Sequence, residues 1–159
     1  MEPKEIAEIL RRVPIFYEFD PGQVERILKI TKEVTYEAEQ FVFHEGEPST
    51  EMLFLISGKF RVQAASGAEI ATIGEAGIVG EMGVLTGQPR SADVVATEPC
   101  VALSVSVEDL FRLIAEDKDV GYKIYRIVTH LLSDRLRESN IKLEQQYLLL
   151  DDIASEDSP

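Results

Sequence analysis

The chain has 159 residues, of which 45% are hydrophobic and 28% charged, and its 29 acidic residues against 16 Lys and Arg give a net charge of −13. This composition is typical of a globular domain and excludes a disordered chain, and the acidic balance argues against a binder of duplex nucleic acid. A single cysteine, Cys100, excludes an intramolecular disulfide, and with only two histidines the chain lacks the three or four ligands of most protein metal sites, so we expect no metal and no cofactor.

The N-terminal segment is predicted to be helical. Ile6, Ile9, Leu10 and Val13 are spaced like the apolar face of a helix, and Pro14 ends the pattern. The segment lacks the features of a secretory signal, and no apolar run reaches the ~20 residues of a membrane-spanning helix. Together with the cysteine usage, these observations predict a cytoplasmic protein with no membrane contact.

A second short helix is predicted after Asp20. Asp20, Pro21 and Gln23 have the spacing of a capping box with proline at the first helical position. Val24 and Ile27 then form its apolar face.

Residues 34–105 change to the period of two that is typical of strands. Short apolar runs lie at 41–43, 52–56, 70–73 and 93–96, with glycines between them where turns are expected. The alternating positions expected to face inward are Phe60, Val62, Ala64, Val101, Leu103 and Val105. The pattern predicts an antiparallel sandwich, roll or barrel.

Helical periodicity returns after Ser106, which is predicted to cap a helix carrying Leu110 and Leu113. After a break near residues 117–119, a long helix is expected over about 120–150, and 151–159 are expected to form an acidic, frayed tail. We therefore expect one domain over residues 1–150.

The long helix carries a seam whose positions alternate by four and three residues, as in a coiled coil. These positions are Leu132, Leu136, Ser139, Leu143, Gln146 and Leu150. One interpretation is a homodimer that pairs this helix with its twin, and the other is packing of the seam on the chain's own β-region. Under both, Ile124, Ile127, Val128 and Leu131 face the β-region.

Residues 78–92 interrupt the strand pattern, and their centre at 81–85 is predicted to form one helical turn. Gly80 and Gly83 would let the backbone approach a ligand closely, and the first amides of a helix suit an anion. Arg90 can pair with two phosphate oxygens, and the hydroxyl of Ser91 can donate a further bond. Because the whole chain repels anions, a phosphate would need such a local cation.

Glu81 would repel a phosphate but would accept a hydrogen bond from a neutral hydroxyl beside it, such as that of a ribose. Residues 80–85 and 89–92, Gly-Glu-Met-Gly-Val-Leu and Pro-Arg-Ser-Ala, closely resemble the phosphate-binding segment of cyclic nucleotide-binding domains. Residues 13–16, 43–48 and 54–62 are also similar to that family, and the resemblance covers about residues 6–140. It implies a mainly β fold: an antiparallel, jelly-roll-like β-roll with N-terminal helices and a long C-terminal helix.

The resemblance also implies a ligand site for a cyclic nucleotide. Backbone groups of Gly80, Glu81, Met82 and Gly83 would meet the phosphate and ribose, and Glu81 would accept from the ribose 2′-hydroxyl. The other residues that it implies are Arg90 and Ser91 on the phosphate, the backbone of Ala92 nearby, and Ser139 and Asn140 on the base. Cyclic AMP is expected rather than cyclic GMP, from the similarity to bacterial cyclic-AMP receptors.

Other interpretations of these residues are weaker. Arg90 could pair with Glu81 across a surface loop, but the complete segment around it favours the ligand role. Gly74, Gly77 and Gly80 imitate a dinucleotide fingerprint but lie in a predicted β-roll, and a cupin-type metal enzyme needs several histidines in its barrel. We therefore expect no enzymatic activity.

The DNA-binding module of bacterial activators would need far more than the nine residues that follow Leu150. We therefore expect a stand-alone cyclic nucleotide sensor that changes conformation, signals through an unidentified protein partner and does not bind DNA. The alternatives are a ligand-free interaction module on the same fold and the regulatory fragment of a larger protein.

Overall fold

Two four-stranded sheets hold the core of the chain in the computed structural model, which describes Lys4, Glu8 and residues 14–156. The sheets have the strand orders β1-β8-β3-β6 and β2-β7-β4-β5, and all their pairings are antiparallel. The strands are β1 (Thr31–Tyr36), β2 (Phe41–Phe43), β3 (Glu51–Ser57), β4 (Phe60–Gln63), β5 (Glu69–Ile73), β6 (Ile78–Val79), β7 (Asp93–Ala96) and β8 (Cys100–Ser106). This arrangement confirms the predicted β-roll.

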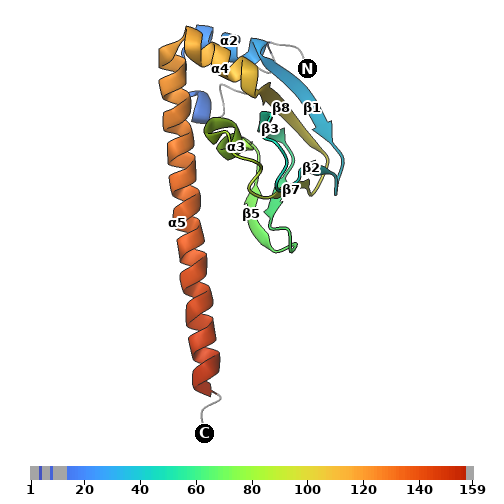
Figure 1. Ribbon diagram of the computed structural model, residues 1–159, viewed down its shortest axis with the longest axis vertical. Coiled ribbons are helices and arrows are strands. Elements are labelled where there is room, and N and C mark those ends of the chain that lie inside the picture. The colour runs from blue at the N-terminus through green and yellow to red at the C-terminus, as the bar shows by residue number, and fades with distance from the viewer. Residues whose placement is uncertain (1–3, 5–7, 9–13, 157–159) are drawn as a thin grey trace. The chain divides into compact units, whose positions relative to one another are not determined.

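Helical elements precede, interrupt and follow the strands, as Figure 1 shows. They are the 3-10 helix η1 (Pro14–Phe16) and the α-helices α2 (Pro21–Lys29), α3 (Glu81–Thr86), α4 (Val107–Glu116) and α5 (Lys118–Glu156). The chain divides into two units, residues 1–121 and residues 122–159. The first unit contains the roll, and the described part of the second is the remainder of α5.

The centre of the roll is a cluster of buried side chains from both sheets. Its members are Phe43, Leu53, Leu55, Phe60, Ile73, Val79, Val94, Ala96, Cys100 and Ala102. Val62 packs against this cluster, as expected, and Cys100 is buried.

The central strand β8 differs from the alternation predicted for it. Val101 is half-buried, whereas Ala102 and Ser104, which the pattern placed outward, are buried like Leu103. β8 lies inside its sheet, between β1 and β3, and side chains on both of its faces are buried. The buried hydroxyl of Ser104 donates a hydrogen bond to the carboxylate of Glu51 on β3.

Local capping rules account for two of the helix starts. The Asp20 carboxylate accepts from the Gln23 amide at 2.9 Å, and the Gln23 side chain accepts from the Asp20 amide at 3.1 Å. The Ser106 hydroxyl accepts from the Asp109 amide at 3.1 Å. Both predicted caps are therefore confirmed, and the positions of these starts follow from the sequence.

The break between α4 and α5 is a single residue, Asp117. Its carboxylate accepts from the amides of Asp119 and Val120, at 3.0 and 3.1 Å, and so satisfies two amides at the start of α5. The helix α5 ends at Glu156 rather than near Leu150, so residues 151–156 continue the helix and do not form the frayed tail that was expected.

The predicted first helix, with Ile6, Ile9, Leu10 and Val13, lies outside the described residues. Within the part of the chain that the structure describes, no helix is both long and apolar enough to cross a lipid bilayer.

Candidate ligand-binding site

The short helix α3 begins with a glycine in the left-handed conformation. It lies between β6 and β7, where the sequence predicted one helical turn. Gly80, its N-cap, has φ 81° and ψ 0°. A side chain would strain this backbone, so glycine is required by conformation alone.

Gly80 also differs from the caps of the two longer helices of the first unit. Asp20 and Ser106 accept hydrogen bonds from their helices' first amides, whereas glycine has no side chain that could do so. The first turn of α3 is closed by the Val84 amide, which donates to the Gly80 carbonyl at 3.3 Å. The amides of residues 81–83 precede that bond, and such amides suit an anionic acceptor.

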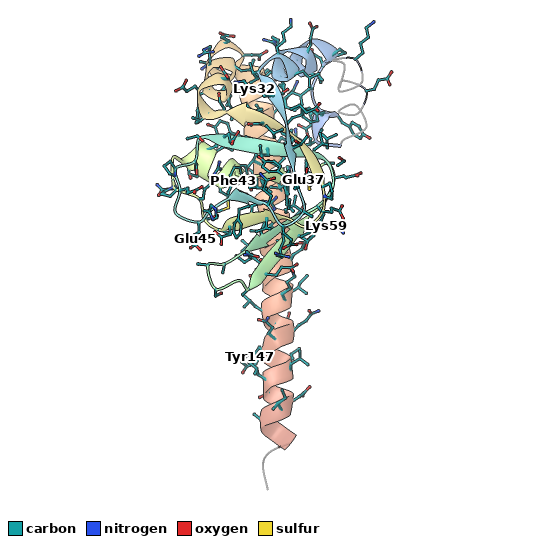
Figure 2. All side chains as sticks on the ribbon, turned by 90° about the vertical axis from the view of Figure 1, so that its right-hand side faces the viewer. Lys32, Glu37, Phe43, Glu45, Lys59 and Tyr147 are labelled. Carbon is teal, nitrogen blue, oxygen red and sulfur yellow. The ribbon has the colours of Figure 1, made fainter. Side chains whose placement is uncertain are left out.

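Arg90 is buried beside this helix start, with only 6% of its surface exposed. Its guanidinium donates to the carbonyl of Gly80 at 3.2 Å and to that of Glu51 at 2.7 Å. The Cζ atom lies 3.5 Å from the centroid of the Phe43 ring, which is itself buried inside the roll (Figure 2). Three groups from distant parts of the sequence thus fix the position of one cation.

Two opposing effects act on the pKa of the Arg90 guanidinium. Burial lowers the pKa of its guanidinium, whereas the negative charges of Glu51, Glu47 and Glu81 raise it. Guanidinium remains protonated in proteins. Burial also raises the pKa of Tyr36, and the Glu51 charge adds to this effect while Arg90 opposes it. The site is therefore a buried cation with several acids around it.

The two glycines of the segment make room for protein atoms. A Cβ at Gly80 would lie 2.5 Å from a terminal nitrogen of Arg90 and 2.9 Å from the Phe43 ring. A Cβ at Gly83 would lie 1.8 Å from the Ser49 hydroxyl. On the side where a Cβ would point, the space at both glycines is thus occupied by protein atoms. The glycines let the helix pack tightly against its surroundings.

The remaining predicted residues of the segment differ in exposure. Glu81 is 1% exposed, whereas Met82 is 46% exposed. The exposed Ser91 donates its hydroxyl to the Met82 sulfur at 3.9 Å, and Ala92 is buried. All the predicted residues from 80 to 92 belong to the first unit, between β6 and the start of β7.

Ser139 and Asn140, the residues predicted to contact the base, belong to the second unit. Both are exposed on α5. Their assignment therefore stays a prediction.

Comparison with known proteins identifies the family. The family model of the cyclic nucleotide-binding domain matches residues 33–117, a stretch that contains the roll's strands from β2 to β8, α3 and Arg90. The chain belongs to the cyclic nucleotide-binding domain family. A solved cyclic nucleotide-binding domain of Methylobacillus flagellatus has 28% sequence identity and a TM-score of 0.79, over 90% of this chain and 83% of that one.

Two curated relatives contain the domain within longer proteins. The CRP-like cAMP-activated global transcriptional regulator of Mycobacterium tuberculosis is 28% identical over 86% of this chain and 61% of its own length. The Pycsar effector protein PaPycTIR of Pseudomonas aeruginosa is 38% identical over 75% of this chain and 34% of its own length. This chain therefore spans less than two thirds of either relative.

The structure adds three residues to the site that the sequence analysis did not single out. Phe43 and Glu51 contact the Arg90 guanidinium, and Ser49 packs against Gly83. The Ser49 hydroxyl also donates to the Gln88 carbonyl at 2.8 Å. Phe43 lay within a quoted family motif, but nothing local indicated its contact with a residue 47 positions away (90 − 43).

The described residues contain no candidate metal site. Among residues 14–156, together with Lys4 and Glu8, no three His, Cys, Asp or Glu side chains gather so that they could hold a metal ion.

Proposed function

We propose that this chain is a sensor that binds a cyclic nucleotide, cyclic AMP rather than cyclic GMP, and passes the signal to another protein. The observation that carries the proposal is the buried guanidinium of Arg90, which donates to the carbonyl of Gly80, the N-cap of α3, at 3.2 Å. Membership of the cyclic nucleotide-binding domain family supports the ligand class. The preference for cyclic AMP is supported by the mycobacterial relative, which is a cAMP-activated regulator.

The phosphate would pair with Arg90 and the amides at the start of α3. Arg90 donates to two carbonyls, and a guanidinium has five N–H donors, so donors are left for a ligand. Water screens a buried charge only weakly, and an anion in contact with it gains more than it would at the surface. A local attraction of this kind is needed because the chain as a whole carries a net charge of −13.

The ribose would be recognised by Glu81. A carboxylate accepts a hydrogen bond from the 2′-hydroxyl, and such a bond to a charged group contributes about 1.5–3 kcal/mol. Ser91 would add a hydroxyl to the phosphate, and Ala92 a backbone group. Together, an acid and a base in one segment would select a cyclic sugar phosphate over inorganic phosphate.

The response to the ligand would lie in the long helix. We propose a homodimer formed through the seam that contains Leu136 and Leu143, which are 62% and 63% exposed. Ser139, in the same seam, and Asn140 would contact the base. Ligand binding would shift an equilibrium between arrangements of α5, and a partner that prefers one arrangement must change nucleotide affinity by the same factor.

Titration calorimetry on the purified protein tests the proposal. The panel contains cyclic AMP, cyclic GMP, cyclic CMP, cyclic UMP and, as the open-ring control, 5′-AMP. We expect saturable binding of cyclic AMP and at least ~10-fold weaker binding of the others, a difference of about 1.4 kcal/mol. Tightest binding of another cyclic nucleotide would overturn the base preference, and no binding of any would overturn the sensor.

A ligand-free interaction module is the second candidate, because the spaces left by Gly80 and Gly83 are already filled by protein atoms. A thermal-shift measurement separates the two functions. A ligand that binds only the folded state increases the free energy of unfolding, by about 2.7 kcal/mol at a ligand concentration of a hundred times its Kd, and so raises the melting temperature. An unchanged melting temperature at millimolar cyclic nucleotide would favour the module.

The cytoplasmic location and the stand-alone form stay predictions. The mass of the protein isolated from its source tests the stand-alone form, and the cell fraction that contains it tests the location.

A further inference from the structure

The last turns of α5 expose large apolar side chains in succession. Tyr147, Leu148, Leu149 and Leu150 are 70%, 55%, 63% and 67% exposed, and Ile153 is 60% exposed. We call these five residues the apolar collar. The side chain of Tyr147 is labelled on α5 in Figure 2.

One neighbouring helix cannot cover the collar. Successive residues of an α-helix are about 100° apart, so four in a row spread over about 300° of the circumference. The stripe that packs against one neighbour is about 100° wide or somewhat more. The seam assigned to a second copy contains Leu150 and passes beside Tyr147, while Leu148 points about 160° away from Leu150.

A second apolar face therefore remains beside the seam. Ile141 is one heptad before Leu148 and shares its side of the helix, and it is 55% exposed. Leu149 and Ile153 continue the apolar surface from Leu148 round to the edge of the seam. We call Ile141, Leu148, Leu149 and Ile153 the second face.

The charge around the C-terminal part of the second face, which contains Leu148, Leu149 and Ile153, is negative, whereas Lys142 stands next to Ile141 in the sequence. From Leu143 to the end of the chain there is no Lys, Arg or His, while Glu144, Asp151 and Asp152 stand beside the collar in the sequence. The last turn of α5 contains no basic residue, so the negative end of the helix dipole adds to these charges. An anionic lipid surface would be repelled.

We propose that the second face is the docking surface for a basic amphipathic helix of the effector protein. Leucine-type side chains of that helix would pack on Ile141 and Leu148, while its Lys or Arg residues would neutralise Glu144, Asp151 and Asp152. The proposal rests on the proposed function in one respect, because the seam is assigned to the second copy. It adds the location and the chemistry of the partner's contact.

Fluorescence anisotropy with the full chain and a synthetic peptide tests the proposal. The probe is an amphipathic helix of about five turns, with leucine on one face and lysine elsewhere, and its twin has glutamate in place of lysine. We expect the lysine peptide to bind at least ~10-fold more tightly than its twin, and added salt to weaken this binding because exposed charges are screened.

A double variant, Leu148→Gln with Leu149→Gln, separates the second face from general attraction to an acidic protein. It changes no charge and should weaken binding of the lysine peptide at least ~10-fold, by loss of apolar contact. The matched control is Tyr122→Gln, since Tyr122 is also on α5 and is 64% exposed. It should leave peptide binding unchanged, and both variants should keep their nucleotide affinity.

Three outcomes would overturn the docking surface. The double variant could bind the lysine peptide as well as the parent does. Light scattering could show an assembly larger than a dimer that the double variant reduces to a dimer, so that further copies cover the face. The parent, but not the double variant, could bind vesicles of neutral lipid. Peptide binding at the second face without any nucleotide binding would reject the proposed function and leave the docking surface standing.

Discussion

The two parts of the predicted ligand site are built in opposite ways. Arg90, in the first unit, is 6% exposed and is held by two carbonyls and an aromatic ring. Ser139 and Asn140, in the second unit, are exposed on a helix. Under the proposed function, the roll would fix Arg90 for the phosphate before any ligand arrives, which would reduce the entropy lost on binding. Ser139 and Asn140 would gain a fixed position at the base only when the helix acquires a neighbour.

This contrast suggests a division of roles. The fixed part of the site, around Arg90, would recognise the cyclic sugar phosphate that the family's ligands share. The base and the downstream response would depend on α5, whose surroundings a ligand or partner can change. The predictions below test the contrast, beginning with the largest expected effect.

Replacing Arg90 should remove most of the affinity. We expect Arg90→Ala to weaken cyclic nucleotide binding by about 2–5 kcal/mol, because it removes one member of a desolvated charge pair. Titration calorimetry measures the change, and Arg90→Lys, which keeps the charge without the planar fork, should recover part of it. The control is Arg112→Ala, an exposed arginine of α4 that pairs with Asp109. Near-unchanged affinity of folded Arg90→Ala protein would reject the assigned role.

Replacing Glu81 should act mainly on nucleotides that carry the 2′-hydroxyl. We expect Glu81→Ala to weaken binding of the ribose form by about 1.5–3 kcal/mol and to affect the 2′-deoxy form much less. The ratio of the two Kd values is the measurement, and it cancels any general loss of folded protein. Equal losses on both forms would contradict the hydroxyl assignment. Glu81→Gln, which keeps an acceptor oxygen, should lie between the parent and the alanine variant.

Replacing Phe43 should have a smaller effect that depends on Arg90. A cation over an aromatic ring contributes about 0.5–2 kcal/mol, so Phe43→Leu should weaken nucleotide binding by up to that amount. In a double-mutant cycle, the same change should cost much less affinity when Arg90 is already alanine. Phe16→Leu, at another buried aromatic of the first unit, should lower stability and leave affinity unchanged. Additive losses in the cycle would show that Phe43 does not act through Arg90.

The exposed residues of α5 should give the smallest change in affinity but the clearest change in base preference. Removing the side chains of Ser139 and Asn140 by alanine should cost about 0.5–1.5 kcal/mol for cyclic AMP, the usual contribution of a hydrogen bond. It should also reduce the ratio between cyclic AMP and cyclic GMP affinities. Thr129→Ala, at an exposed helix position where the hydroxyl bonds to the Tyr125 carbonyl at 2.7 Å, is the control. An unchanged ratio would place base recognition elsewhere in the chain.

Local features of the fold could be predicted because they depend on residues close together in the sequence. The caps at Asp20 and Ser106 and the short helix after Gly80 all agree with the sequence analysis. The end of α5 was misplaced by several residues. Helix ends depend weakly on local residues when no Pro or Gly stops the helix, and the first Pro after Leu150 is Pro159.

The sequence by itself determined the order and type of most of the described elements, the family segment around Glu81 and Arg90, and the acidic charge that makes a local cation necessary. Only the tertiary structure decided what surrounds that cation. The Glu51 carbonyl comes from 39 positions away and the Phe43 ring from another strand, and the same packing buries Ser104 and fills the spaces at Gly80 and Gly83. The physical reason is that capping and periodicity involve near neighbours along the chain. The burial and partners of a side chain depend instead on which distant strands the sheet order brings together.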